Sequence, residues 1–140
     1  SFRGADLSAA DLDGAQAKGA SFGEAKLPGA RFAKAMLRYA TFSKADVARA
    51  NFTGADLRES LFVEAKAEGA LFVGARLTWA DLSHADLRGA DLSDADLTRA
   101  NLHAVRDDGA RFAGATTATA RRTDLDRLEA EGWTQPRAAE

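Results

Sequence analysis

The chain has 140 residues, enough for one domain, and 46% of them are hydrophobic, enough to form a core. Its 19 basic and 21 acidic residues give a net charge of -2, which excludes a strongly basic or polyanionic protein. The absence of Cys excludes disulfides, thiolate nucleophiles and cysteine zinc sites. No run of about 18 apolar residues and no charged-then-apolar leader occurs, so we expect no membrane span, no signal peptide and a cytoplasmic location.

A five-residue repeat runs through most of the chain. Of the 24 positions taken every fifth residue from Ala5 to Ala120, 22 are Ala, and the exceptions are Ser60 and Val105. Two residues after each Ala there is usually Leu or Phe. This period fits neither a helix nor a long strand. It fits a chain that turns a corner every five residues, with both of these columns pointing inward.

The residue between the two columns is often Asp or Asn, as in Ala-Asp-Leu at 5–7, Ala-Asn-Phe at 50–52 and Ala-Asp-Leu at 85–87. This tandem motif resembles the pentapeptide-repeat family of bacteria. The resemblance implies an all-β solenoid, a right-handed quadrilateral β-helix, with about six coils of 20 residues. We therefore predict a β-helix over 1–120 and a C-terminal capping or dimerisation segment over 121–140.

Stacking at 20-residue intervals makes two predictions about the rod. Neighbouring coils should lie about 4.8 Å apart, so Phe rings should stack on two opposite walls: Phe22, Phe42 and Phe62 on one wall, and Phe32, Phe52 and Phe72 on the other. Charges should alternate in an exposed ladder formed by Asp6, Lys26, Asp46, Lys66, Asp86 and Arg106.

The pattern weakens near the end of the repeats. Asp107 occupies an inward position, where an unpaired carboxylate would be costly to bury, and it follows Val105 in the alanine column. We therefore expect residues 103–109 to bulge outward, either because the repeat pattern degenerates there or because they form a functional loop.

A short helix is predicted after the repeats stop. Thr123 is a good N-cap, Asp124 and Asp126 suit a first turn, and the helix should cover about 124–131. Because a solenoid needs its last coil covered, we expect contacts from Leu125, Leu128 and Trp133. These contacts would form either a cap within the chain or, as the resemblance also allows, a homodimer interface.

The N-terminal residues 1–5 are already in register with the repeat. The first coil is then open unless preceding sequence or a second copy covers it, so we expect the chain to be a domain of a longer protein.

The sequence offers little chemistry. His84 and His103 are the only histidines, and the repeat places both at outward positions on one wall of neighbouring coils. Two imidazoles without a nearby carboxylate or Cys do not make a metal site, and the spacings support neither a Ser-His-Asp arrangement nor a phosphate-binding glycine pattern. We therefore expect no enzyme activity, no cofactor and no metal.

The outer surface is the remaining place for function. Some outward positions hold apolar or aromatic residues near arginines, a composition typical of binding hot spots, although such residues also suit strands. The candidate partner surface comprises Lys18, Met36, Arg38, Tyr39, Arg58, Leu61, Val63, Leu71, Val73, Trp79 and Arg99. Because Leu61 and Leu71 fall on opposite walls, these residues cannot all meet one flat partner.

Two functions follow. The first is a non-catalytic protein-protein interaction module or rigid scaffold, whose partner is another protein rather than nucleic acid or a membrane. The alternative, which the resemblance implies, is a mimic of B-form DNA that binds DNA gyrase and protects it from topoisomerase poisons such as quinolones. That mechanism requires an acidic stripe along the rod, whereas residues 1–120 contain 16 acidic and 15 basic residues, and their longest charged column alternates in sign.

Overall fold

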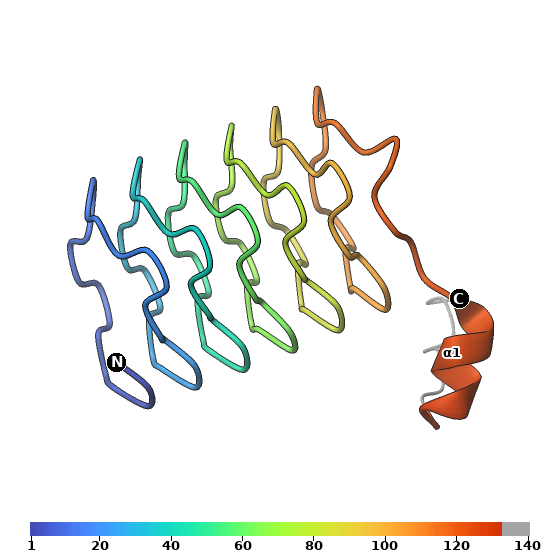
Figure 1. Ribbon diagram of the computed structural model, residues 1–140, viewed down its shortest axis with the longest axis horizontal. Helices are drawn as coiled ribbons and strands as arrows, with labels where there is room; N and C mark the ends of the chain where they lie inside the picture. The colour runs from blue at the N-terminus through green and yellow to red at the C-terminus, as the bar shows by residue number, and fades with distance from the viewer. Residues whose placement is uncertain (133–140) are drawn as a thin grey trace.

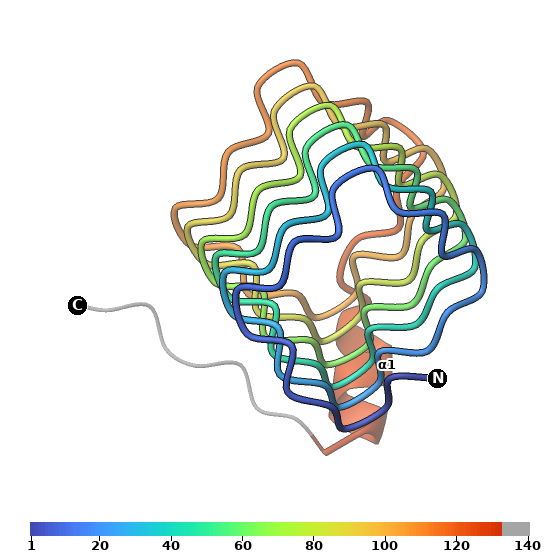
Figure 2. The ribbon, with the colours of Figure 1, turned by 90° about the vertical axis from the view of Figure 1, so that its left-hand side faces the viewer.

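A computed structural model describes residues 1–132 of the chain. The chain winds as a series of coils stacked side by side, with helix α1 (Leu125–Ala130) beyond the last coil (Figure 1). Viewed along the stack, each coil is four-sided (Figure 2). Trp133, assigned above to the cap or dimer contact, lies outside the described residues.

Successive coils are joined by parallel β-bridges that are each one residue long. Every fifth residue from Asp6 to Asn101 is bridged to the residue 20 positions later, and the last bridge joins Asn101 to Arg121. The Leu7 N–H donates to the Lys26 carbonyl at 2.8 Å, and the Lys26 N–H donates to the Ala5 carbonyl at 2.9 Å. This bonding pattern repeats along the rod, so the 20-residue spacing expected from the sequence is present.

The Asp or Asn of the repeat acts on the local backbone. Its side-chain oxygen accepts a hydrogen bond from the N–H two residues later at ten positions, with distances of 2.9 to 3.3 Å. Asp and Asn are the residues that favour such turns. The preference for these two residues is therefore explained by turn formation at the start of each corner.

Because these carboxylates form turns, the predicted charge ladder needs correction. The bridges do align Asp6 with Lys26 and Asp86 with Arg106, but none of these aligned pairs forms an ion pair within the described residues. Asp6 instead accepts from the Ser8 hydroxyl at 2.6 Å, and Asp86 pairs with Arg88 at 2.7 Å. The aligned charges contribute only at longer range, because the turn hydrogen bonds orient the carboxylates along their own coil.

Each corner is a tight turn whose third residue is left-handed. The Ala5 N–H donates to the Phe2 carbonyl at 3.0 Å, and the equivalent bond closes later corners. Every fifth residue from 4 to 114 has a φ between 55° and 74°. Thirteen of these residues are not glycine, so side chains such as those of Tyr39 and Trp79 project from a backbone conformation that normally favours glycine.

The core contains the two predicted ring stacks. Phe2, Phe22, Phe42 and Phe62 stack with centroid separations of 4.7 to 5.2 Å. Phe32, Phe52 and Phe72 stack at 5.0 and 5.1 Å. The two stacks meet edge to face, for example Phe42 with Phe52 at 5.3 Å and 84°. The corner alanines from Ala25 to Ala100 are buried beside them, so the core is confirmed as alternating large and small columns.

Residues 103–109 do not bulge, so that prediction was wrong. Leu87 donates to the Arg106 carbonyl at 2.7 Å and Gly89 donates to the Asp108 carbonyl at 3.0 Å, which keeps these residues in register. Asp107 is nevertheless exposed. No described residue is stacked beyond it on its inward side, so its carboxylate remains hydrated without a change of path.

Helix α1 covers only part of the last coil. Asp124, and not the predicted Thr123, is its N-cap and accepts from the Arg127 N–H at 3.0 Å, because the Thr123 hydroxyl accepts instead from the Ala104 N–H at 3.3 Å. The Leu128 side chain is buried, whereas Leu125 is 66% exposed and Phe112 in the last coil is only partly buried. Among residues 1–132 Leu128 provides the apolar cover, and Leu125 stays a candidate for a contact with a second copy.

Candidate functional site

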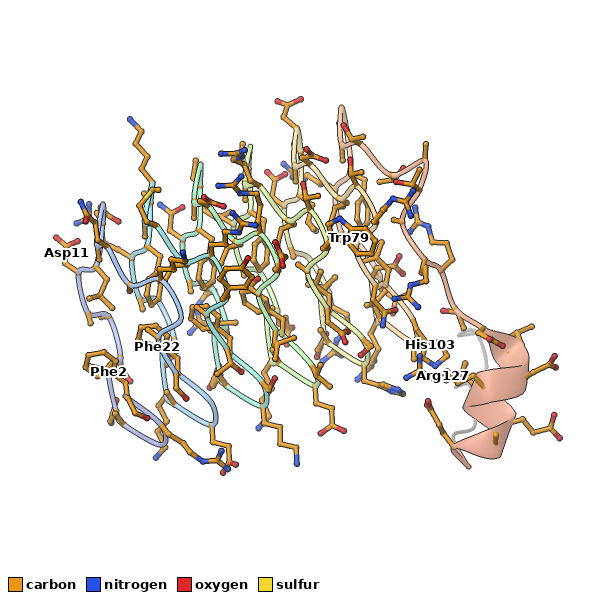
Figure 3. All side chains as sticks on the ribbon, in the orientation of Figure 1. Phe2, Asp11, Phe22, Trp79, His103 and Arg127 are labelled. Atoms are coloured by element: carbon orange, nitrogen blue, oxygen red, sulfur yellow. The ribbon has the colours of Figure 1, made fainter. Side chains whose placement is uncertain are left out.

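One wall of the rod carries exposed aromatic rings held by cations. Tyr39 is 46% exposed, with the Arg38 guanidinium 4.8 Å and the Lys18 ammonium 5.6 Å from its ring centroid. Trp79 is 55% exposed, with the Arg99 guanidinium 5.2 Å from its ring centroid. Figure 3 shows Trp79 on the side of the rod that faces the viewer. We call this surface, with Met36 and Arg58, the aromatic wall.

Ion pairs fix two arginines of the aromatic wall. Arg58 binds Asp56 through two bonds of 2.8 and 2.6 Å, and this contact chiefly holds the pKa of Asp56 below its usual range. Arg38 binds Glu59 at 2.6 Å. Lys18 and Arg99 make no ion pair with the described residues, so their charges remain available to a partner.

The other predicted surface residues lie elsewhere. Leu61 and Leu71 are exposed, while Val63 and Val73 are half-buried. Leu61 bridges Thr41 and Asp81, and Leu71 bridges Asn51 and Asp91. These are two different bridge columns, ten residues apart in a 20-residue coil. Met36 of the aromatic wall bridges Gln16 and Asp56, so Leu71 lies in a different column from the aromatic wall.

A second cluster forms where α1 meets the rod. The Nε2 atom of His84 lies 2.9 Å and that of His103 lies 3.5 Å from Oε2 of Glu131. Figure 3 shows His103 beside Arg127 of α1, at the end of the rod. Arg127 binds the other Glu131 oxygen, Oε1, at 2.7 Å, and this bond chiefly lowers the pKa of Glu131, with His103 and His84 adding to the effect.

Sequence reasoning missed this cluster. It placed both imidazoles outward and found no carboxylate near them, whereas His103 is only 2% exposed because α1 covers it, and Glu131 follows α1. The 20-residue stacking does bring the two histidines together, at 5.3 Å between ring centroids. The five-residue period ends before Glu131, so nothing in the repeat could place that side chain.

A shallow hollow opens at one corner of the rod. It is lined by Ala48, Arg49, Glu68, Gly69, Arg88, Gly89 and Asp108. Arg88 already bonds to Asp86 and reaches Glu68 at 3.5 Å, so the hollow presents acidic and basic groups that are partly paired with each other. Among residues 1–132, no helix has the length and apolar character needed to cross a membrane.

A comparison with known proteins identifies the same five-residue repeat. The family model described as Pentapeptide repeats matches in eight copies, over residues 1–23, 18–54, 42–78, 50–89 and 75–106. No curated protein matches the chain.

Two solved structures share its fold. The pentapeptide repeat protein Rfr23 from the cyanobacterium Cyanothece 51142 is 22% identical over 73% of this chain, with a TM-score of 0.55. A trypsin-treated form of QnrB1, a plasmid-mediated fluoroquinolone resistance protein, is 23% identical over 85% of this chain, with a TM-score of 0.51. The chain spans 63% of the Rfr23 structure and 68% of the QnrB1 structure. These likenesses support the right-handed quadrilateral β-helix predicted above.

Proposed function

Because the chain belongs to the pentapeptide-repeat family, we propose that it is a non-catalytic module that binds another protein through the aromatic wall. The observation that carries this proposal is the exposure of Tyr39 and Trp79 on a rigid surface, each ring held by a cation. Large aromatic side chains beside arginine are the usual anchors of protein interfaces.

The wall also defines the chemistry of the partner. Tyr39 and Trp79 are 40 residues apart, which is two coil spacings, or roughly 10 Å. Lys18 lies beside Tyr39 and Arg99 beside Trp79, and neither has a carboxylate partner among the described residues. We therefore expect a partner that brings two apolar contacts and acidic side chains next to them.

The test removes the rings while respecting the backbone. Tyr39 and Trp79 have φ of 64° and 62°, so the double variant Tyr39→Gly with Trp79→Gly loses both rings and keeps an acceptable corner conformation. The wild-type protein and the double variant would each be immobilised, and the proteins that each captures would be identified by mass spectrometry. The captured partner would then be purified, and its binding to each protein would be measured by titration. Leu71→Ala, outside the aromatic wall, is the matched control.

We expect the double variant to lose at least about 2 kcal/mol of binding free energy, roughly thirtyfold in affinity, and Leu71→Ala to bind like wild type. Circular dichroism would show that both variants keep the rod. A partner that binds the double variant as tightly as wild type would remove the aromatic wall as the interface.

Gyrase protection is tested with the same protein. The likeness to QnrB1 supports the fold only, and the nearly balanced charges of residues 1–120 do not resemble a duplex. We expect no inhibition of supercoiling by a bacterial gyrase and no rescue from a quinolone at stoichiometric amounts of protein. Rescue would replace the present proposal by the DNA-mimic alternative.

A further inference from the structure

Three potential metal ligands meet where α1 rests on the rod. One ring nitrogen of His84, one of His103 and a carboxylate oxygen of Glu131 all lie within 4.8 Å of one another. They come from two neighbouring coils and from the C-cap of α1. The backbone N–H of His84 donates to the backbone carbonyl of His103 at 2.9 Å, and the two imidazole rings are inclined at 82°. The spacing of the two imidazoles is therefore set by the backbone of the rod.

His103 is the group that the contacts within the chain leave unexplained. Its side chain is 2% exposed, and among residues 1–132 its Nε2 atom is buried without a hydrogen-bond partner, although Oε2 of Glu131 lies 3.5 Å away. A buried polar atom without a partner is costly and calls for an unseen water or ion. This atom is directed towards the same carboxylate that His84 contacts.

Glu131 is oriented to supply one oxygen. Arg127, one turn earlier, binds Oε1 at 2.7 Å, which leaves Oε2 facing the two imidazoles at 2.9 and 3.5 Å. A hydrogen bond to the outer oxygen of a carboxylate is a common way to orient a metal ligand.

We propose that His84, His103 and Glu131 bind one divalent transition-metal ion, with Zn²⁺ the best match. Zinc prefers four ligands at about 2.0 to 2.2 Å, which places ligand atoms roughly 3.3 Å from one another. The two separations between a histidine nitrogen and the Glu131 oxygen, 2.9 and 3.5 Å, bracket that spacing, and the two histidines offer nitrogens within 4.8 Å of each other. Two imidazoles and one carboxylate form a recognised zinc ligand set, and water takes the fourth position.

Binding requires one local change. The Asp124 N–H donates to Nδ1 of His103 at 3.0 Å, so in the metal-free protein the proton of this ring is on Nε2. When the metal takes Nε2, the proton moves to Nδ1 and the Asp124 amide turns away from the ring. This rearrangement and the nearby Arg127 charge both weaken binding, so we expect an affinity in the micromolar range.

The metal would clamp α1 onto the rod. A helix of six residues is not stable by itself in water, and in the described part of the chain its apolar attachment is Leu128. Coordination of Glu131 to two histidines of the rod would strengthen the contact that Glu131 already makes with His84 at the C-terminal end of the helix. Metal binding is thereby coupled to the order of α1, whatever partner the aromatic wall binds.

The test is a calorimetric titration of the full chain with ZnCl₂ near neutral pH. The protein must carry no histidine tag, because His84 and His103 are the only histidines and a tag would provide a competing site. We expect one Zn²⁺ per chain, and we expect His84→Gln and Glu131→Gln each to weaken binding by at least roughly tenfold. The control is Glu129→Gln, an exposed residue of the same helix, which should bind like wild type.

Two spectroscopic measurements identify the ligands without relying on variants. Nitrogen NMR of the imidazoles should show the His103 proton on Nε2 before Zn²⁺ is added and on Nδ1 afterwards. Co²⁺ should give the intense visible absorption of a four-coordinate site. Equal Zn²⁺ affinity of wild type, His84→Gln and Glu131→Gln, or no one-to-one binding at millimolar Zn²⁺, would overturn the proposal.

Discussion

At the scale of single residues, the corner position combines two demands. The backbone requires a positive φ, which glycine meets without strain, yet 13 corner positions carry side chains, among them Tyr39, Trp79 and His84. Those three contribute to the aromatic wall or to the α1 cluster. The corners that project side chains thus supply the surface chemistry at some cost in backbone free energy.

This cost is measurable at Lys34, which is exposed and has a φ of 58°. We expect Lys34→Gly to raise the free energy of unfolding by about 0.5 kcal/mol, because the left-handed strain outweighs the added freedom of the unfolded chain. The adjacent Ala33→Gly, at an ordinary φ, should lower it by about 0.5 to 1 kcal/mol. Urea unfolding of the two variants gives the comparison; destabilisation by both would show that the corners are not strained.

Asp56 links a turn to an ion pair, and its pKa is lowered chiefly by Arg58. A lowered pKa in the folded state confers stability above the ordinary value of 3.8, and this stability is lost as pH falls through the folded value. We expect Asp56→Asn to be less stable than wild type at neutral pH and to lose less stability on acidification.

Asn51 shows why this substitution isolates the charge. Asn51 accepts the same turn hydrogen bond from the Thr53 N–H, at 3.0 Å, so Asn at position 56 can keep the turn. Thermal unfolding from neutral to acidic pH would measure both proteins. Parallel pH profiles would mean that the Asp56 ion pair contributes nothing to acid sensitivity.

At the scale of structural elements, the ring stacks concentrate the core energy in the middle of the rod. Phe52 is fully buried, stacks on Phe32 and Phe72 at 5.0 and 5.1 Å, and meets the opposite stack edge to face. Phe112 is only partly buried, and the Arg122 guanidinium lies over its ring, 5.9 Å from the ring centroid.

We expect Phe52→Ala to lower the free energy of unfolding by about 3 to 5 kcal/mol, because it removes a large side chain and leaves a cavity. The same truncation at Phe112 should cost clearly less, because the last coil is open to solvent on its outer side. Chemical denaturation would measure both. Equal losses would mean that the end coils are as well packed as the centre.

The helix shows where prediction from the sequence reached its limit. The length and the burial of Leu128 follow from local rules, and the predicted range of about 124–131 agrees with the observed Leu125–Ala130, whereas the predicted N-cap was one residue too early. The position of the helix against His103 does not follow from the repeat, so the contact of Glu131 with the two histidines could not be predicted. The prediction of a bulge at Asp107 was wrong for a related reason, because the repeat pattern cannot show that an inward position is open to solvent.

At the scale of the whole molecule, the 20-residue stacking makes length an adjustable property. Duplication of residues 41–60 should add one coil, lengthen the rod by about 4.8 Å and raise its melting temperature. Small-angle scattering and calorimetry would measure this. Duplication of residues 41–59 should prevent folding, because every later inward side chain moves out of register; a folded product would contradict the stacking described here.

The four-sided coil also restricts how such a surface can be inherited. Adding or losing five residues preserves the inward columns but turns all later walls by a quarter of a revolution. Tyr39 and Trp79 would then face different directions after such an event between them. Only changes of 20 residues leave the aromatic wall in one plane. Drift in repeat number can therefore create new combinations of neighbouring surfaces without disturbing the core, while a selected binding wall limits the chain to steps of one complete coil.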